Sequence, residues 1–451
     1  MGIRERLQNN TEVGVVATES RRNMANVNSA SRKLRTELLD RLDFVRAGAL
    51  SDKELREQIR HILETIIEEQ ELTLGEDVIA QIIRQVEDET LGLGPIEALL
   101  QDPNISDILI NGPNQVYVER FGKLELTRIR FRSEADLRHV IDRIVSRVGR
   151  RIDESSPMVD ARLLDGSRVN AIIPPLALDG SSLSIRRFGK RAIHMDDLLT
   201  RQALTPAMAK LLHAAVRARM NIIISGGTGS GKTTLLNALS ESISNDERVI
   251  TIEDSAELRL LQPHIVRLET RPPNLEQSGE VTARDLMRNA LRMRPERIII
   301  GECRGAESLD MLQAMNTGHD GSMTTVHANS TRDVLARLET LVLFAGFNMP
   351  ESAIRGQIAS AIDLIVQASR LSDGTRRVMS ISEVTGMEGP VVATQDIFTF
   401  NRRGIGEKGE VLGSFSATGV IPAFLEQLQL TGAQIDPAMF DPGFGVEGHQ
   451  R

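Results

Sequence analysis

The sequence Asn221-Ile-Ile-Ile-Ser-Gly-Gly-Thr-Gly-Ser-Gly-Lys-Thr-Thr-Leu-Leu-Asn-Ala-Leu-Ser240 decides how the central part of this chain folds. Its apolar run, residues 222–224, is typical of a buried parallel strand. Leu235, Leu236 and Leu239 recur at helical spacing further on. Between them, residues 226–233 have the spacing G-x-x-x-x-G-K-T. A strand, a glycine-rich loop and a helix in this order predict a loop that binds phosphate groups.

The residue types in this loop suit a nucleoside triphosphate. Glycines let backbone N–H groups curve around an anion, because no Cβ intervenes. Lys232 is expected to reach the β- and γ-phosphates, and Thr233 to hold Mg²⁺ through its hydroxyl. A chance glycine-rich turn is the alternative, which the flanking strand and helix disfavour. The predicted ATP contacts are Gly226, Gly227, Thr228, Gly229, Ser230, Gly231, Lys232, Thr233 and Thr234.

Composition limits what the rest of the chain does. Its 451 residues are enough for two or three domains, and 41% hydrophobic with 26% charged residues is typical of a soluble protein. No apolar run reaches about 18 residues, and the start lacks the apolar segment of a signal peptide. The one cysteine, Cys303, excludes a disulfide framework and fits the cytoplasm. A net charge of −8 disfavours a protein that coats nucleic acid.

Changes of pattern along the chain predict its domains. Residues 1–30 lack periodicity and are expected to form a mobile tail. Residues 31–90 have the pattern of amphipathic helices and predict an N-terminal helical bundle. In residues 91–188, short β-prone runs and Asp-Gly turns predict a small α+β domain with an antiparallel sheet. A linker, residues 189–204, precedes a motor domain, residues 205–451.

Strands and helices alternate after the phosphate loop, which predicts an α/β domain with a mainly parallel, doubly wound sheet. Beyond residue 362 we expect three antiparallel strands, at residues 364–368, 378–384 and 391–400. The last part of the chain is expected to hold one short helix, near residues 422–428.

Two groups of carboxylates follow predicted strands. The apolar strand Arg-Ile-Ile-Ile-Gly-Glu ends in Glu302, at the edge where parallel sheets bind ligands. Many P-loop proteins have Asp before this glutamate, whereas this chain has Gly301. We expect Glu302 to activate water, and holding Mg²⁺ through water is its alternative role. Glu253 and Asp254 follow another predicted strand.

Histidines and arginines indicate the function less clearly than the phosphate loop and the carboxylates do. His319 and His327 flank one predicted strand of the sheet that holds the phosphate loop. Arg284, Arg288 and Arg292 share one helix face, which suggests a solvated or subunit-contacting surface. A nucleic-acid groove is the alternative for these arginines, but the chain has one Tyr and no Trp to stack on bases.

Taken together, these motifs resemble the secretion and pilus traffic ATPases. The phosphate loop is followed by an acidic box at residues 251–258, by Gly-Glu-x-Arg-x-x-Glu within residues 298–307, and by a histidine box at residues 317–330. This is the order in which the family has its four boxes.

The resemblance is stronger for one branch of that family. Residues 104–113 and 116–120 look like the start of the domain that precedes the motor in the CpaF-like branch, which powers Flp or tight-adherence (Tad) pilus assembly. The type II secretion branch usually has a four-cysteine zinc insertion, which this chain lacks. The type IV secretion motors are harder to exclude on these sequence features. The resemblance covers roughly residues 35–400.

The resemblance implies a P-loop (RecA-like) motor that forms a cytoplasmic homo-hexamer and uses ATP and Mg²⁺. Nucleotide would lie between the small α+β domain and the motor domain. The ring would associate peripherally with the inner membrane through a pilus platform protein, and no nucleic-acid partner is expected. Whether such a motor extends or retracts a pilus is left open.

The family pattern also implies residue roles. Lys232 and Thr233 would contact phosphate and Mg²⁺, Glu302 would activate water, and His327 would respond to phosphate. Glu253 and Asp254 belong to the acidic box; Glu253 is expected to take part in catalysis, and both to take part in holding Mg²⁺.

Arginines of the small domain often complete the site in this family. The candidates are Arg162, Arg168, Arg186 and Arg187. We expect Arg168 or Arg187 to contact the nucleotide, which would couple lobe closure to hydrolysis. The alternative is pairing with surface carboxylates, which would contribute under about 1 kcal/mol.

Two other classes of function compete with a motor that acts on a membrane partner. A nucleic-acid translocase shares the P-loop and the ring, and DNA would stimulate its ATPase activity. A nucleotide-gated scaffold would bind ATP without turnover.

Overall fold

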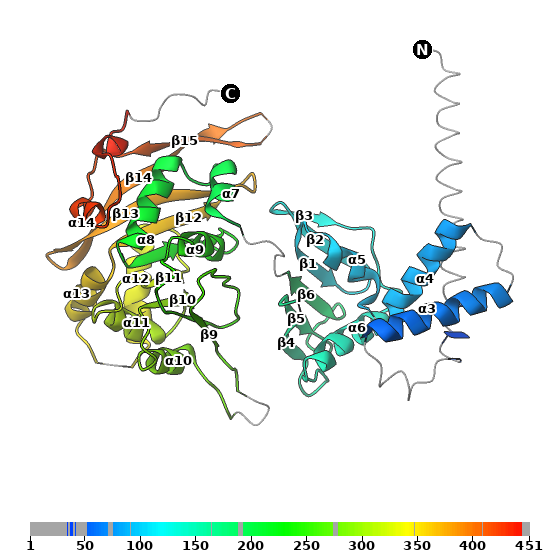
Figure 1. Ribbon diagram of the computed structural model, residues 1–451. Helices are drawn as coiled ribbons and strands as arrows, with labels where there is room; N and C mark the ends of the chain where they lie inside the picture. Colours follow the sequence, from blue (N-terminus) through cyan, green and yellow to red (C-terminus); the bar gives the residue numbers. More distant parts are fainter. Residues whose placement is uncertain are drawn as a thin grey trace, which may run out of the picture. The chain divides into compact units, whose positions relative to one another are not determined.

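The computed structural model describes residues 34, 37, 38, 41, 52–70, 75–90, 92–163, 165–187, 193–273, 278–346, 348–407 and 409–443. The chain divides into two compact units, Met1–Gly189 and Lys190–Arg451, which are considered separately (Figure 1). The predicted mobile tail and residues 189–192 of the predicted linker lie outside the described residues. None of the described helices has the length and apolar content needed to cross a membrane.

The first unit begins with two amphipathic helices, α3 (Asp52–Glu69) and α4 (Glu76–Thr90). Their apolar faces pack together in a small core, so residues 52–69 and 76–90 have the helical pattern expected for them. Buried members of this core are Leu34, Leu38, Ile59, Leu63, Ile66, Ile67, Ile82, Ile83 and Val86.

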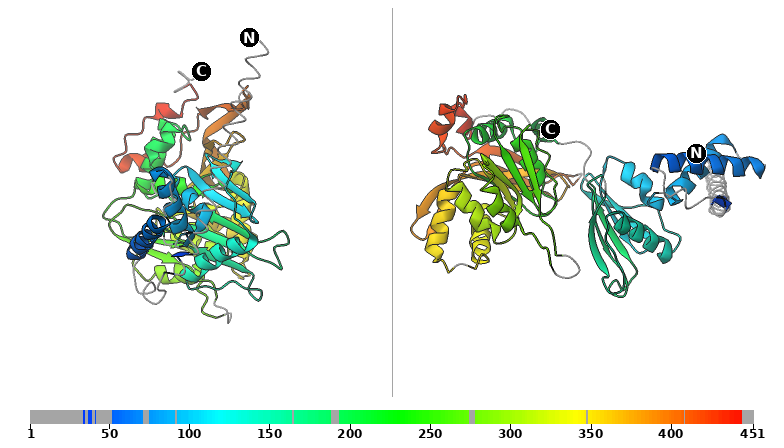
Figure 2. Two further views of the ribbon diagram at one scale, coloured as in Figure 1. Left: turned by 90° about the vertical axis from the view of Figure 1, so that its right-hand side faces the viewer. Right: turned by 60° about the horizontal axis from the view of Figure 1, so that its bottom comes forward.

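A six-stranded sheet follows, in the order β3-β2-β1-β6-β5-β4. All neighbouring strands pair antiparallel, as predicted. Helix α6 packs its apolar stripe on one face of this sheet (Figure 2). The Ser133 side chain caps the helix by accepting from the Asp136 N–H. The elements are η1 (Gly94–Ile96), α5 (Glu97–Gln101), β1 (Ile105–Asn111), β2 (Gln115–Arg120), β3 (Lys123–Leu126), α6 (Glu134–Arg147), β4 (Met158–Arg162), β5 (Arg168–Ile172) and β6 (Ser182–Arg186).

The second unit is built on a nine-stranded sheet, in the order β15-β14-β13-β12-β7-β11-β10-β8-β9. Strands from β12 to β9 in this order are parallel, which confirms the expected parallel sheet. The strands are β7 (Ile222–Ser225), β8 (Val249–Glu253), β9 (Ile265–Glu269), β10 (Arg297–Cys303), β11 (Met323–Val326), β12 (Leu364–Arg370), β13 (Arg376–Glu388), β14 (Val391–Ile405) and β15 (Val411–Ala417).

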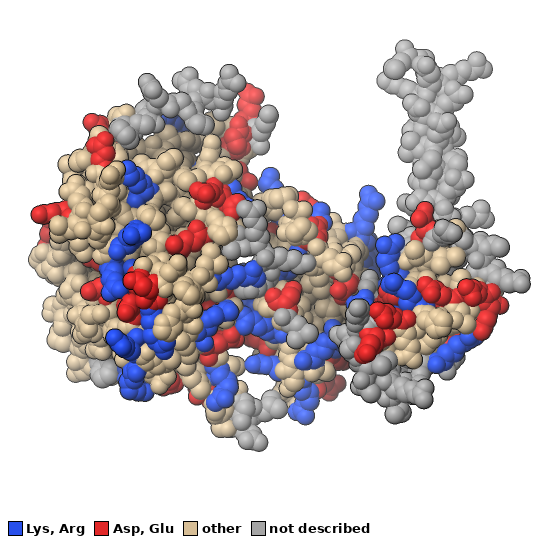
Figure 3. Space-filling view, in the orientation of Figure 1, with Lys and Arg blue, Asp and Glu red and all other residues tan. Residues whose placement is uncertain are grey.

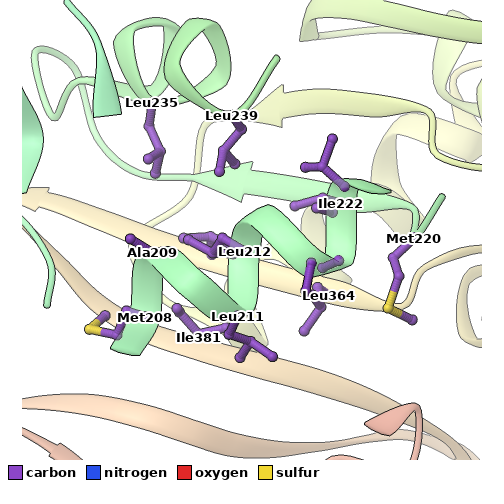
Figure 4. Packing of buried hydrophobic residues seen from close by; sticks show 14 of the residues in the cluster. Met208, Ala209, Leu211, Leu212, Met220, Ile222, Leu235, Leu239, Leu364 and Ile381 are labelled. Atoms are coloured by element: carbon purple, nitrogen blue, oxygen red, sulfur yellow. The ribbon is translucent and has the colours of Figure 1, made fainter. Parts of the chain in front are cut away.

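Helices cover both faces of this sheet because its central strand is apolar on both sides. Ile222 contacts the core under α8 and α9 (Figure 4). Ile224 belongs to the same core, which also includes residues of α7 and α14. Ile223 points the other way, into the core shared with α10, α11, α12 and α13. The helices are α7 (Met195–Thr200), α8 (Pro206–Arg217), α9 (Lys232–Ser240), α10 (Ala283–Ala290), α11 (Glu307–Met315), α12 (Thr331–Leu343), α13 (Glu351–Ala361), α14 (Leu425–Leu430) and η2 (Pro437–Phe440).

The second unit differs from the sequence prediction in three places. Strand β12 is antiparallel to β13 but parallel to β7, so it joins the parallel part of the sheet. Strand β15 lies where only a short helix was expected, and it is paired with β14 and packed through Phe415 against Phe400, with ring centroids 4.9 Å apart. Helix α7 lies in the predicted linker, and its Leu198 is buried in the motor core.

Candidate active site

The phosphate loop lies where the order of strands reverses. Strand β7 ends at Ser225 and α9 begins at Lys232, so the connecting loop is at the carboxyl edge of the sheet. The neighbours of β7 are β11 and β12, whereas the next strand in sequence, β8, lies beyond β10. Ligands of open α/β sheets bind at such a switch point.

Close packing explains the glycines of this loop. A Cβ on Gly226 would lie 2.3 Å from the Ala368 carbonyl oxygen and 2.4 Å from Ser230 Oγ, which leaves no room for a side chain. Gly229 and Gly231 have φ of +71° and +94°, where glycine avoids the strain of an L side chain. Gly231 is also the N-cap of α9, so the helix N-terminus points into the loop.

Lys232 lies over the same loop. Its Nζ donates to the carbonyl oxygens of Gly226, at 2.9 Å, and of Gly227, at 3.1 Å. Thr233 follows in the first turn of α9. The structure therefore brings the predicted phosphate contacts, residues 226–234, together on one loop and one helix turn, and this set of donors fits an anionic nucleotide.

Glu253 fills the space that Gly301 leaves open. It ends β8, is only 4% exposed, and its Oε1 accepts from the N–H groups of Glu257, at 2.7 Å, and Leu258, at 2.9 Å. A Cβ on Gly301 would lie 3.0 Å from Glu253 Cγ. A side chain at position 301 would therefore require Glu253 to shift.

The buried position of Glu253 changes the pKa of its carboxyl group and the hydrogen bonding of its oxygens. Burial raises the pKa of its carboxyl, and the backbone hydrogen bonds from Leu258 and Glu257 oppose that rise. Its Oε2 is buried and has no hydrogen-bond partner among the described residues. A buried, more basic carboxylate oxygen is suited to accept a proton or to bind a water molecule.

Glu302 lies near the end of β10 in an ionic cluster. Its Oε2 accepts from Arg304 at 2.6 Å, and Arg304 is also 3.6 Å from an Asp254 carboxylate oxygen. The side chain of Glu302 is 23% exposed, and that of Asp254 is 44% exposed. Arg304 was missed by the sequence reasoning, although it is the arginine of the Gly-Glu-x-Arg motif.

Protein side chains at this site would supply only some of the ligands of a magnesium ion. Within the described residues, no group of three or more His, Cys, Asp and Glu is arranged to hold a metal. Mg²⁺ usually takes few protein ligands and completes its shell with phosphates and water. The assignment of Thr233, Glu253 and Asp254 as Mg²⁺ ligands stays a prediction.

The two histidines lie at opposite ends of β11. His327 follows Val326, which pairs with Ser225 at the start of the phosphate loop. His319 precedes the strand, and its Nδ1 is 3.1 Å from the Pro295 carbonyl oxygen. Only His327 therefore lies at the edge of the sheet that holds the phosphate loop.

The arginines of α10 are not free cations. Arg284 Nε lies 2.9 Å from a carboxylate oxygen of Asp310, and Arg288 Nε lies 3.2 Å from the other. Asp310 is buried, so these pairs tie α10 to α11. Arg284 and Arg288 are therefore engaged with Asp310 inside the second unit and are not simply solvated.

The arginines of the first unit fall into two groups. Arg162, Arg168 and Arg186 stand opposite one another across β4, β5 and β6. They lie on the sheet face that does not pack on α6, because Val169 and Ile185 on the same strands point into the core. Arg187 instead donates to the carbonyl oxygens of Asp102 and Ile105, the second at 3.1 Å. Its guanidinium is thus bound to the backbone of its own unit.

A parallel sheet with a phosphate loop at its switch point, and carboxylates on two further strands, defines a P-loop ATPase. The family model described as "Type II/IV secretion system protein" matches residues 89–404, and the chain belongs to this family.

Several curated proteins are similar to this chain. A Mycobacterium tuberculosis protein, named as a candidate conjugal transfer protein, is 39% identical over 326 residues, or 71% of this chain and 92% of the relative. Conjugal transfer protein TrbB of Rhizobium radiobacter is 34% identical over 68% of this chain and 91% of its own length. Type IV secretion system protein VirB11 of Bartonella henselae is 31% identical over 68% and 94%.

Solved structures are similar as well. The VirB11 ATPase of Brucella suis, in complex with sulphate, is 30% identical with a TM-score of 0.35, and the match covers 64% of this chain and 94% of that one. The pilus retraction motor PilT with bound ADP is 17% identical with a TM-score of 0.47, over 75% and 86%.

Proposed function

We propose that this chain is the motor ATPase of a Flp/Tad type IV pilus. It works as a cytoplasmic homo-hexamer that associates peripherally with the inner membrane through a platform protein. The observation that carries the proposal is the CpaF-like pattern at residues 104–120 ahead of the four motor boxes, in a chain with a single cysteine. Family membership supports the broader class of secretion motor.

The geometry supports the following roles of the site residues in ATP hydrolysis. The loop amides and Lys232 bind the phosphates of ATP, and Mg²⁺, when bound, neutralises charge that develops on them. Glu302 accepts the proton of the attacking water, which requires its carboxylate to leave Arg304 or to share it. Glu253 holds a water molecule or a proton through its buried Oε2. His327, which follows the end of β11, responds to the presence of the phosphate.

A type IV secretion motor is the second candidate. The names of the relatives favour it, since they refer to conjugal transfer and to type IV secretion. A nucleic-acid translocase is less well supported, because the net charge is −8 and basic and acidic side chains are interspersed on the face of the second unit shown in Figure 3.

A complementation experiment separates the two candidates. A strain that lacks this gene is complemented with the wild-type chain or with Lys232→Ala, and surface filaments and conjugal transfer are both measured. The pilus proposal predicts that filaments are lost without the gene and return only with the wild-type chain. Normal filaments together with lost DNA transfer would instead support the secretion motor. Copurification from membranes would then identify the platform protein.

Ring formation is tested independently. Light scattering of the full chain at micromolar concentration with nucleotide is expected to give the mass of six subunits. A monomer under all conditions would contradict a ring.

A further inference from the structure

The phosphate loop packs against a hairpin that lies far away in sequence. Strand β12 runs parallel to β7, with Gln367 opposite Ser225, the last residue of β7. Because β12 continues to Arg370, its end extends alongside the loop. The Ala368 carbonyl oxygen is the atom that would lie nearest to a Cβ on Gly226, at 2.3 Å.

Two arginines of this hairpin contact the loop. Arg376, the first residue of β13, donates from Nε to the Gly229 carbonyl oxygen at 2.8 Å. Its Cδ would be 3.2 Å from a Cβ on Gly231, and Arg370 Nη1 would be 3.4 Å from a Cβ on Gly229. The two guanidinium groups therefore lie beside the part of the loop whose N–H groups bind phosphate.

The turn between the two arginines is well fixed. Asp373 accepts from the Thr375 N–H at 2.9 Å and from its hydroxyl at 2.6 Å. Its other carboxylate oxygen accepts from the Val411 N–H of β15 at 2.9 Å. Such a turn holds the ends of β12 and β13 in place and limits the cost of ordering two long side chains at the loop.

We propose that Arg370 contacts the phosphates of the bound nucleotide and that Arg376 holds the loop in its anion-binding form through Gly229. The ligand is a nucleoside di- or triphosphate, and the inference rests on nucleotide binding at this loop. Guanidinium groups suit this role, since they stay charged and match the geometry of phosphate oxygens. Arg376 acts on a neutral carbonyl, so it is a positioning residue, whereas Arg370 contributes its charge.

The experiment measures nucleotide affinity of the full chain over a series of salt concentrations. A fluorescent ATP analogue is displaced by ADP and, separately, by inorganic pyrophosphate, which contains only the phosphates. Arg370→Ala is expected to lower the affinity for ADP and for pyrophosphate roughly 10-fold or more and to reduce the salt dependence of binding. Arg376→Ala should lower both affinities while the salt dependence stays as in the wild type. Arg376→Lys should recover part of the lost affinity.

Arg403→Ala is the matched control, because it removes the same charge from an exposed position on β14. It should bind like the wild type. Arg370→Gln keeps most of the side-chain length and replaces Arg370→Ala if that variant does not fold. Wild-type affinity and wild-type salt dependence in the Arg370 variants would overturn the proposal. If the wild-type chain binds no nucleotide, the ATPase assignment itself fails; if Lys232→Ala loses binding while the Arg370 variants retain it, only the present inference fails.

Discussion

At the scale of single residues, Glu253 and Gly301 depend on each other. The carboxylate on β8 occupies the space beside Gly301 on β10, within a sheet in which both strands are parallel neighbours. Both residues are recognisable in the sequence, where Gly301 stands in the place of the usual Asp. Their contact is not predictable, because the register between two strands separated by about 50 residues is not visible in a local pattern.

The pH dependence of stability tests the burial of Glu253. Its pKa is raised by burial, so the folded state keeps a proton that the unfolded chain has already lost. The contribution of Glu253 to the free energy of unfolding should therefore fall as pH rises through and above the ordinary carboxyl range. Glu253→Gln has no such titration, so the stability of the wild type relative to this variant should improve as pH is lowered from 8 towards 4. Urea unfolding at several pH values measures the difference, and a constant difference would contradict the buried, raised-pKa state.

At the scale of elements, the phosphate loop and the strands around it form one unit. The short apolar strands and the glycine loop were predictable, since local hydrophobic runs and a fixed spacing determine them. Strand β3 was missed because all four of its residues are exposed. Strand β15 contains glycine and serine, and its strand state comes from pairing with β14. The contacts of Arg370 and Arg376 with the loop were also unpredictable, because they join segments about 140 residues apart.

Two adjacent glycines give a matched test of the loop. Gly226→Ala places a methyl group 2.3 Å from the Ala368 carbonyl oxygen, whereas the nearest atom to a Cβ on Gly227 is Asn329 Oδ1 at 3.9 Å. Overpacking costs about 1–3 kcal/mol, which corresponds to roughly a 5- to 150-fold loss of ATP affinity if the loop must shift. Gly227→Ala should bind ATP nearly as the wild type does. Equal affinities in a binding titration of the two variants would show that the packing described here does not control the loop.

A buried ion pair joins β10 to the segment before β8. Arg297 is 0% exposed and donates to Glu247 at 2.6 Å and 2.9 Å. Glu247→Ala would leave the guanidinium unpaired and should reduce the free energy of unfolding by about 3–5 kcal/mol. Glu296→Ala is the control, since Glu296 is 42% exposed and forms its ion pair with the exposed Arg219, so its loss should cost under about 1 kcal/mol. Similar midpoints in urea unfolding would contradict a structural role of the buried pair.

At the scale of the whole molecule, a motor must couple hydrolysis to movement of its units. Arg168 stands in register with Arg162 and Arg186 on a sheet face of the first unit, whereas Arg187 is bound to backbone carbonyls. The expectation that Arg168 or Arg187 contacts the nucleotide stays a prediction.

The coupling is tested by separating binding from turnover. Arg168→Ala should bind ATP almost as the wild type does and turn it over roughly 10²–10³-fold more slowly, since it removes a charge that stabilises the transition state. Arg187→Ala and the double variant are measured in parallel, and Arg130→Ala, at an exposed position of the same unit, is the control. Turnover near the wild-type rate in both single variants and in the double variant would reject the coupling.

The most direct test of the central claim, that this chain is an ATP-hydrolysing motor with Glu302 as its base, is to measure ATP binding and steady-state turnover in one preparation of Glu302→Gln. The amide keeps the shape of the side chain but does not accept a proton. The account predicts wild-type affinity with turnover reduced roughly 10²–10⁴-fold. Lys232→Ala, measured beside it, should lose affinity instead. A fall in turnover of less than about 10-fold in Glu302→Gln would contradict the assignment of Glu302 as the general base.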